Sequence, residues 1–285
     1  MTTITDTTVR GYSARNIPVQ GSSLQVLDWA STSDMSASIL CVHGFCGAAH
    51  DFQICADSYT GRILALDLLG HGGSAPIPDA KALTLDQTVN QVVEATNALE
   101  LEAPVLLGYS MGGRIALATV LAYPNRFSGL ILVGATAGLQ GEEQRRDRRQ
   151  SDEELARRAR RLGSADFSSY WATQDLIQTQ QTIPEPYRTL MQAERRGLSM
   201  STIVASLEGL GQGVCPDQWE NLTTIKVPVV LITGESDTKY GRIAQKMATR
   251  LPVGQHIVLP DVGHAAHLEC PQGFSRVLDS ILNRV

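Results

Sequence analysis

One glycine-rich turn in this sequence has residue types that suit nucleophilic or acid-base chemistry. Residues 108–113 read Gly-Tyr-Ser-Met-Gly-Gly, directly after the apolar run Pro-Val-Leu-Leu and directly before a helix-like segment at 114–122. A Gly-x-Ser-x-Gly turn between a buried strand and a helix forces the serine into a sharp corner and exposes its hydroxyl above the sheet. The amide groups at the start of that helix favour negative charge at the same place. Ser110 is therefore a candidate nucleophile or base.

A serine hydroxyl becomes reactive when a histidine accepts its proton and a carboxylate fixes the tautomer of that histidine. After a turn of this kind the chain order is serine, acid, histidine, with the last two on loops after later strands. Asp237 follows the apolar run at 229–232, and His264 follows the run at 256–259. We therefore predict a triad of Ser110, Asp237 and His264. Neighbours in the same loops remain alternatives for the acid or the histidine: Glu235, Asp261 and His267.

Two backbone amides are candidates for holding a developing negative charge. One belongs to Met111, the residue after the serine, and the other is expected in a loop after an early strand. The sequence Val-His-Gly-Phe at 42–45 follows such a strand, so we expect Phe45 to supply the second amide. His43 and His71 are interpreted as structural histidines that hydrogen-bond to the backbone of their loops.

The elements that must position these residues alternate between short apolar runs and helical stretches, which predicts an α/β fold with a mostly parallel central sheet flanked by helices. No strand-like run lies between residues 134 and 226, and we interpret this interval as an inserted helical cap. We expect a core at residues 1–135 and 222–285 and a cap at 136–221. The expected strands are 24–29, 38–42, 62–66, 104–107, 129–133, 227–232 and 256–259, and the expected cap helices are 140–162, 167–179, 186–196 and 201–210.

Arginines near the serine and in the cap suggest an anionic substrate. Arg114 lies four residues after Ser110, so on a helix the two share a face. A partly buried guanidinium needs an anion, which is either a substrate carboxylate or an acid of the protein itself. At the start of the cap, Arg145 and Arg148 are spaced to share a helix face and are candidates for binding a second carboxylate. Most other arginines of this run are expected on a solvated face.

Composition narrows the class of partner. The chain has 285 residues, 43% hydrophobic content and a net charge of -5, which argues against nucleic acid as a partner. The polar start and the absence of a long uncharged apolar run predict no membrane insertion, and we expect a cytoplasmic protein. Five scattered cysteines without a Cys-x-x-Cys pair are expected to be reduced thiols, and no metal site is expected.

Several longer patterns stand out in the sequence: Gly-Tyr-Ser-Met-Gly-Gly-Arg at 108–114, Gly-Ala-Thr-Ala-Gly-Leu at 134–139, Arg-x-x-Arg-x-x-x-Asp at 145–152, Gly-Leu-Gly-Gln-Gly at 209–213 with Trp219, Gly-Glu-x-Asp-x-Lys-Tyr at 234–240 and Gly-His-Ala-Ala-His-Leu-Glu-x-Pro at 263–271. Together they resemble one particular family of the α/β-hydrolase superfamily, the 2-succinyl-6-hydroxy-2,4-cyclohexadiene-1-carboxylate synthases of menaquinone and phylloquinone biosynthesis. The resemblance covers about residues 40–274, and it departs from the family pattern at Ala48, where a serine is frequent, and at 170–177.

This resemblance implies the α/β-hydrolase fold and a lyase that eliminates pyruvate from a succinyl cyclohexene bearing several carboxylates. The triad then acts as a base, and the amides of Phe45 and Met111, together with Tyr109, hold the developing negative charge. No metal or organic cofactor is implied. The residues that the resemblance assigns to the substrate are Tyr109, Arg114, Arg148, Trp171, Gln174 and Arg195, and we add Arg145 and Lys239 from the quoted motifs as further candidates.

Two other functions remain open from the residues alone, because a fold does not fix a reaction. One is a serine hydrolase, either a carboxylesterase or an enzyme that cleaves carbon-carbon bonds. The other is a non-catalytic binding protein on the same fold, against which the complete Ser110, Asp237 and His264 set argues. The sequence does not determine an oligomeric state.

Overall fold

The computed structural model describes residues 10–30 and 38–282 and confirms the α/β-hydrolase fold. Eight strands form one sheet in the order β1-β2-β4-β3-β5-β6-β7-β8. The pairs β1·β2 and β2·β4 are antiparallel, and all others are parallel. The strands are β1 (Ser13–Val19), β2 (Ser22–Trp29), β3 (Ser38–Val42), β4 (Arg62–Leu66), β5 (Val105–Tyr109), β6 (Gly129–Val133), β7 (Val229–Gly234) and β8 (Gly254–Leu259).

The central strands form because their apolar runs are buried on both faces, as is usual in a parallel sheet. Every residue of β5 and β6 is buried. The seven expected strands are present with small shifts at their ends, whereas β1 was not expected. Five of its seven residues are exposed, because β1 lies at the edge of the sheet and pairs only with β2. An exposed edge strand has no apolar run by which the sequence could reveal it.

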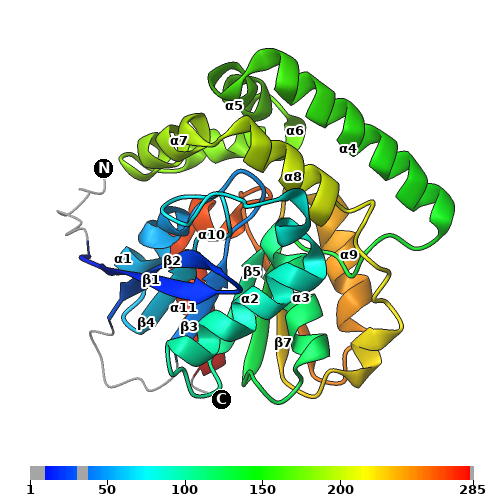
Figure 1. Cartoon of the computed structure of the whole chain (residues 1–285). Coiled ribbons are helices and arrows are strands. Elements are labelled where there is room, and N and C mark those ends of the chain that lie inside the picture. The colour runs from blue at the N-terminus through cyan, green and yellow to red at the C-terminus, as the bar shows by residue number, and fades with distance from the viewer. Residues whose placement is uncertain (1–9, 31–37, 283–285) are drawn as a thin grey trace.

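Helices cover both faces of the sheet (Figure 1). One hydrophobic cluster joins the sheet to α2 (Leu85–Ala98), α3 (Met111–Ala122) and α9 (Thr238–Ala248). A second cluster joins the opposite face to α1 (Gln53–Ser58), α10 (Ala266–Glu269) and α11 (Pro271–Leu282). Three short 3-10 helices belong to the connections: η1 (Ala49–Phe52), η2 (Ala80–Leu83) and η4 (Asn221–Thr224).

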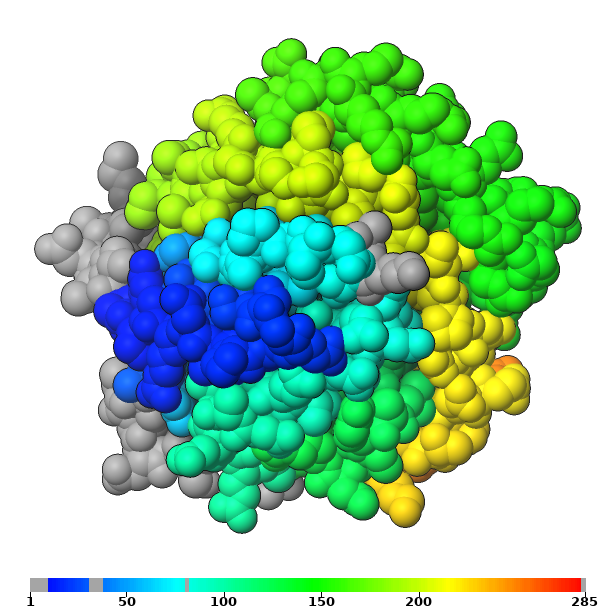
Figure 2. All heavy atoms as spheres, in the orientation of Figure 1, coloured from blue at the N-terminus to red at the C-terminus, as the bar shows by residue number. Residues whose placement is uncertain are grey.

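Between β6 and β7 the secondary-structure elements are all helices, and they lie over the end of the sheet at the top of Figure 1. Figure 2 shows these residues, green to yellow, resting against the core. Tyr187 donates to Asp57 at 2.7 Å and Thr202 donates to the carbonyl of Gly70 at 3.2 Å, which attaches this cap to the core. Its elements are α4 (Glu142–Leu162), α5 (Ser164–Ala172), α6 (Asp175–Gln178), η3 (Thr179–Thr182), α7 (Tyr187–Gly197) and α8 (Met200–Leu210).

One expected cap helix, at 167–179, is wrong as a single element. The backbone of Gln174 is extended, with φ -71° and ψ 139°, and this separates α5 from α6. The Thr173 hydroxyl donates to the carbonyl of Tyr170 at 2.8 Å, so a side chain occupies the end of α5 and helps to terminate it. Within the described ranges, no helix is long and apolar enough to cross a membrane.

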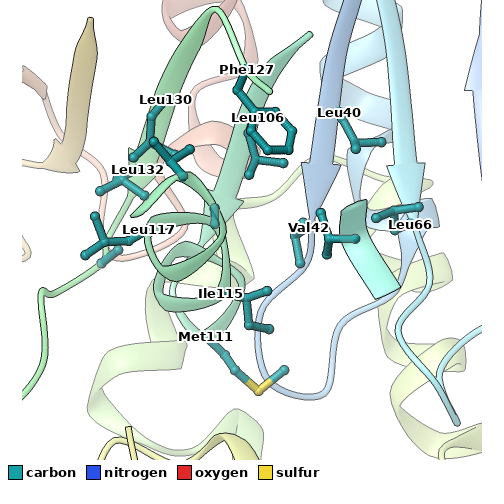
Figure 3. Packing of buried hydrophobic residues seen from close by; sticks show 14 of the residues in the cluster. Leu40, Val42, Leu66, Leu106, Met111, Ile115, Leu117, Phe127, Leu130 and Leu132 are labelled. Atoms are coloured by element: carbon teal, nitrogen blue, oxygen red, sulfur yellow. The ribbon is translucent and has the colours of Figure 1, made fainter. Parts of the chain in front are cut away.

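Helix α3 packs closely on the strands that position the site. Figure 3 shows Met111, Ile115 and Leu117 of α3 among the buried side chains of the sheet. The approach is closest at Gly112, where an added Cβ would lie 2.2 Å from the carbonyl oxygen of Val42. Only glycine allows a helix backbone this near to a strand backbone.

We therefore expect Gly112→Ala to destabilise the protein by about 1–3 kcal/mol, the usual cost of forcing an extra methyl group into a packed core. Gly197→Ala is the matched control, because nothing lies within 4 Å of its added Cβ and alanine is the better helix former. Urea unfolding of both variants measures the difference. A Gly112→Ala variant as stable as Gly197→Ala would contradict the close approach.

Candidate active site

Ser110 stands between β5 and α3 in a strained backbone conformation, with φ 52° and ψ -105°. Its amide donates to the carbonyl of Val133 at 2.8 Å, which fixes the corner against β6. Gly108 must be glycine, because a Cβ there would lie 2.3 Å from the carbonyl oxygen of Gly112. Non-glycine residues with positive φ cost about 1–3 kcal/mol and are concentrated at functional sites. The serine is thus held where its hydroxyl faces the cap.

Three side chains from distant loops meet at this corner. The Nε2 atom of His264 lies 3.0 Å from the hydroxyl oxygen of Ser110, and its Nδ1 lies 2.6 Å from Oδ2 of Asp237. Asp237 follows β7 and begins α9, whose Tyr240 amide donates to its other carboxylate oxygen at 3.2 Å. Since a carboxylate only accepts, Nδ1 carries the proton and Nε2 can accept the serine proton. This geometry allows a proton relay, and it brings together the three residues expected for the triad.

The loop that carries His264 is fixed by a carboxylate for which the sequence suggested no role. Glu269 accepts from the amides on either side of the histidine, that of Gly263 at 2.7 Å and that of Ala265 at 3.1 Å. It also accepts from the hydroxyl of Thr179 in the cap at 3.0 Å. The glutamate belonged to the motif at 263–271, but the spacing alone did not indicate that it folds back onto its own loop.

The other histidines near the site are structural. His43 contacts the carbonyl of Gly44 at 2.8 Å through Nδ1, and its Nε2 accepts from the amide of Leu68 at 3.2 Å. Burial lowers the pKa of His43 to about 3. His267, the alternative histidine, is fully buried beside the ring of Tyr109, and burial lowers its pKa to about 3 as well. Both imidazoles are therefore neutral near pH 7.

A cavity of about 330 Å³ opens beside the relay, and it is large enough for a small ligand. Ser110 and His264 line it, as do both residues expected to provide oxyanion amides, Phe45 and Met111. Met111 is the first residue of α3, where helix amides have no partner within the helix. Four cationic side chains line the cavity, against one acid, Asp175, among the lining residues that the structure describes. These cations are Arg114, Arg148, Arg195 and Lys239.

Arg114 has no ion pair among residues 10–30 and 38–282, so the alternative of an internal salt link is not what the structure contains. Its Nη2 donates to the carbonyl of Leu210 at 2.6 Å. Its Nε is buried and has no partner within the same ranges. A buried guanidinium nitrogen without an acceptor is costly, and a bound carboxylate would remove that cost.

The other two arginines of the cavity are held by cap residues. Arg148 contacts Asp152 at 2.8 Å and Gln212 at 3.1 Å. Arg195 is 7% exposed, and its Nη2 donates to Oε1 of Gln180 at 2.7 Å. Arg195 forms no ion pair with any described acid within 4 Å, and its Nε has no partner in the described chain. The charge of Arg195 also acts on the buried carboxyl of Asp51, where it lowers the pKa against the larger effect of burial, and the Nε of Arg195 can still donate to an anion in the cavity.

Two expected substrate contacts, Arg145 and Gln174, are not among the cavity-lining residues. The guanidinium of Arg145 is held by the carboxylate of Glu142 and the carbonyl of Leu139, both at 3.1 Å, near the start of α4. Gln174 donates back to the carbonyl of Tyr170 at 3.1 Å. Each of these two side chains therefore bonds to residues close to it in the sequence. Trp171 does line the cavity, where its ring meets that of Phe45 edge to face.

Sequence reasoning also missed two buried glutamines at the cavity. Gln180 donates to the hydroxyl of Tyr109 at 3.2 Å, and Gln212 donates to the hydroxyl of Tyr240 at 2.7 Å. The ring of Tyr240 lies 4.6 Å from that of His264. Gln212 and Tyr240 belonged to the motifs quoted above, whereas nothing in the sequence distinguished Gln180 from its neighbours. No cluster of three or more potential metal ligands occurs in the described chain.

Comparisons with known proteins agree with this geometry. The family model described as "Alpha/beta hydrolase family" matches residues 39–277. A putative 2-succinyl-6-hydroxy-2,4-cyclohexadiene-1-carboxylate synthase of Bacillus subtilis is 33% identical over 254 residues, which is 88% of this chain and 92% of the relative. The synthase of that name from Salmonella typhimurium is 31% identical over 245 residues, 86% of this chain and 92% of the relative.

Among solved structures, MenH from S. aureus superposes with a TM-score of 0.84 at 25% identity, covering 91% of this chain and 98% of that one. A thermophilic esterase from Thermogutta terrifontis has a TM-score of 0.77 at 23% identity over 95% of this chain and 98% of that one, a likeness of fold alone. The chain belongs to the alpha/beta hydrolase family and, within it, to the 2-succinyl-6-hydroxy-2,4-cyclohexadiene-1-carboxylate synthases.

Proposed function

We propose that this chain is a lyase that eliminates pyruvate from 2-succinyl-5-enolpyruvyl-6-hydroxy-3-cyclohexene-1-carboxylate and forms the product after which its relatives are named. One observation carries the proposal: the relay of Ser110, His264 and Asp237 faces a cavity lined by four cationic side chains. A simple ester has no need of so much positive charge. A small substrate with several carboxylates does.

The reaction removes a proton and an enolpyruvyl group from the ring. The proton on ring carbon 2 is acidic because it lies beside the succinyl carbonyl. Its bonding electrons form a double bond between carbons 2 and 3, the existing double bond moves to carbons 4 and 5, and the bond from carbon 5 to the ether oxygen breaks. The departing enolate takes up a proton and becomes pyruvate. No electrons are gained or lost overall, so the proposal requires no redox cofactor.

In this proposal the serine oxygen is the base. As it removes the ring proton, its own hydroxyl proton passes to Nε2 of His264, and Asp237 stabilises the imidazolium that results. Negative charge then develops on the succinyl carbonyl oxygen. The amides of Phe45 and Met111 and the hydroxyl of Tyr109 are proposed to stabilise that charge. All three residues line the cavity beside Ser110, which supports these roles.

The succinyl, ring and enolpyruvyl groups of this substrate each carry one carboxylate. We infer that Arg114, Arg148, Arg195 and Lys239 bind them, because these cations line the cavity and a carboxylate is the natural partner of a guanidinium. Trp171 is proposed to pack against the ring of the substrate. The roles of Arg145 and Gln174 are not part of the proposal.

We also infer a division into a core, residues 1–135 and 222–285, and a cap, residues 136–221, which is supported by the purely helical elements between β6 and β7. All five cysteines are free thiols, which favours the reducing cytoplasm as the compartment. The proposed partner is the small polycarboxylate alone. Nucleic acid and membrane insertion have no part in the reaction.

The purified protein should release pyruvate from this enolpyruvyl ether far faster than it cleaves simple aryl esters. A lactate dehydrogenase assay follows pyruvate, and p-nitrophenyl acetate measures ester cleavage in the same buffer. Because the serine is proposed to act as a base, no acyl-enzyme should accumulate. Rapid ester cleavage without pyruvate would instead identify a hydrolase.

Replacing Ser110 with alanine should lower kcat for pyruvate release by about 10³-fold or more, since the base is removed while the oxyanion amides and the cations remain. Binding of the substrate should persist and can be measured by calorimetric titration. A Ser110→Ala variant with nearly full turnover would show that another group removes the proton.

Arg114→Ala should lower kcat/KM by about 10-fold to 150-fold, which corresponds to about 1.5–3 kcal/mol for one charged hydrogen bond. Arg146→Ala is the control: its side chain is 65% exposed, and its ion pair with Asp147 is long at 3.8 Å. Steady-state kinetics on both variants separates a cavity arginine from a solvated one. Equal effects of the two substitutions would remove Arg114 from the proposed binding set.

A further inference from the structure

Gln180 links the cap to the catalytic corner through both ends of its side-chain amide. Its Oε1 accepts from Nη2 of Arg195 at 2.7 Å, and its Nε2 donates to the hydroxyl of Tyr109 at 3.2 Å. Gln180 is 3% exposed, Arg195 7% and Tyr109 8%, so little of each side chain is open to solvent. Gln180 and Arg195 come from the cap, whereas Tyr109 ends β5 directly before Ser110.

The direction of both hydrogen bonds that link Arg195, Gln180 and Tyr109 is determined by the chemistry of these groups. A guanidinium only donates, so the amide oxygen of Gln180 must face Arg195 and the amide nitrogen must face Tyr109. An amide nitrogen only donates, so the oxygen of Tyr109 must accept. Burial raises the pKa of Tyr109, so the phenol keeps its own proton. That proton cannot point to Gln180, and a phenol O–H lies close to its ring plane, so the proton turns to the other side of the oxygen.

We propose that Gln180 is a positioning residue that directs the phenolic proton of Tyr109 toward the reacting part of the substrate. The inference rests on the proposed function, because the acceptor is the carbonyl oxygen on which negative charge develops. Without Gln180 the hydroxyl would be free to rotate. With it, the donor is oriented before the substrate enters, and such preorganised donors contribute most where charge develops in a water-poor site.

These two hydrogen bonds also connect carboxylate binding at Arg195 to the hydroxyl donor of Tyr109. Arg195 polarises the amide of Gln180, and the amide in turn polarises the phenol, since hydrogen bonds in series strengthen one another. A substrate carboxylate at Arg195 would draw on the same guanidinium from its other side. The positive charge in the cap and the donor beside Ser110 are therefore parts of one buried network.

Gln180 could instead have a purely structural role, as a polar side chain that attaches η3 to the core. The two roles predict different effects of replacing Gln180 with glutamate. Glutamate has the shape of glutamine and would form an ion pair with Arg195, so for cap attachment it is the mildest replacement. An ionised carboxylate cannot donate, however. Tyr109 would then have to donate to residue 180, and its proton would turn away from the substrate.

We therefore expect Gln180→Glu to lower kcat for pyruvate release by about 10-fold to 100-fold with little change in KM, the range of one hydrogen bond to a charged group. Gln180→Met, which has a similar length but neither bond, leaves the hydroxyl free to rotate and should lose less. The order of activity is wild type, then methionine, then glutamate. A structural role gives the reverse order for the two variants, with the unfolding temperature following the same order as the activity.

A double-mutant cycle with Tyr109→Phe separates the orientation of the hydroxyl from the added negative charge of Gln180→Glu. If Gln180 acts through the hydroxyl, the glutamate substitution should cost less than about 3-fold in the phenylalanine background. A full loss in that background overturns the inference, and so does a glutamate variant as active as wild type. In both cases pyruvate release by the wild-type protein leaves the proposed function intact.

A second measurement does not depend on turnover. With ring-labelled tyrosine, the infrared C–O band of Tyr109 is isolated by subtracting the Tyr109→Phe spectrum from that of the full chain. The band should change from the position of an accepting phenol to that of a donating phenol in Gln180→Glu. An unchanged band refutes the proposed bond direction, even if the protein released no pyruvate at all.

Discussion

The backbone conformation of Ser110 is the constraint on which the site depends. A left-handed φ of 52° at a non-glycine residue is unfavourable, and it persists because neighbouring elements leave no room to relax. Its amide is bonded to β6 at 2.8 Å, and α3 lies against β3 through Gly112. The same packing that buries the apolar face of α3 therefore fixes the hydroxyl within 3.0 Å of His264. A substitution that disturbs the packing of α3 should therefore also disturb the distance between Ser110 and His264.

Electrostatics explains why the chain needs a cap as well as a core. A serine relay in an open sheet would stand in water, where the field of a nearby guanidinium is weak. The helices between β6 and β7 contribute Arg148 and Arg195 to the cavity that Ser110 lines, while Arg114 comes from the core. In the proposed function, their charges would act on an anionic substrate in this cavity, so residues that bind the substrate carboxylates would also favour its loss of a proton.

Local patterns predicted the central strands, the serine corner and the triad, because each depends on a short apolar run followed by a polar residue at the strand end. The patterns missed β1, most of whose residues face solvent. Arg145 was expected from helical spacing, which does not say which local group a long side chain will bond. Gln174 was expected from the resemblance, which departs from the family pattern at 170–177, and its side chain also bonds locally. Gln180 went unassigned because its partner Tyr109 is 71 residues away. Glu269 went unassigned because spacing does not show that its side chain folds back onto the amides of Gly263 and Ala265.

The carboxylate of Glu269 accepts hydrogen bonds from the backbone amides on both sides of His264 and from the hydroxyl of Thr179. The cap also approaches this loop closely, because a Cβ on Gly263 would lie 2.2 Å from the hydroxyl oxygen of Thr179. The cap and the loop that carries His264 are therefore closely packed against each other. A cap without a hydroxyl at position 179 would lose this bond to Glu269 and would weaken the anchoring of the loop that carries His264. A chimera of such enzymes that exchanges the cap should therefore also exchange the loop at 263–269, so that the two contacting surfaces still match.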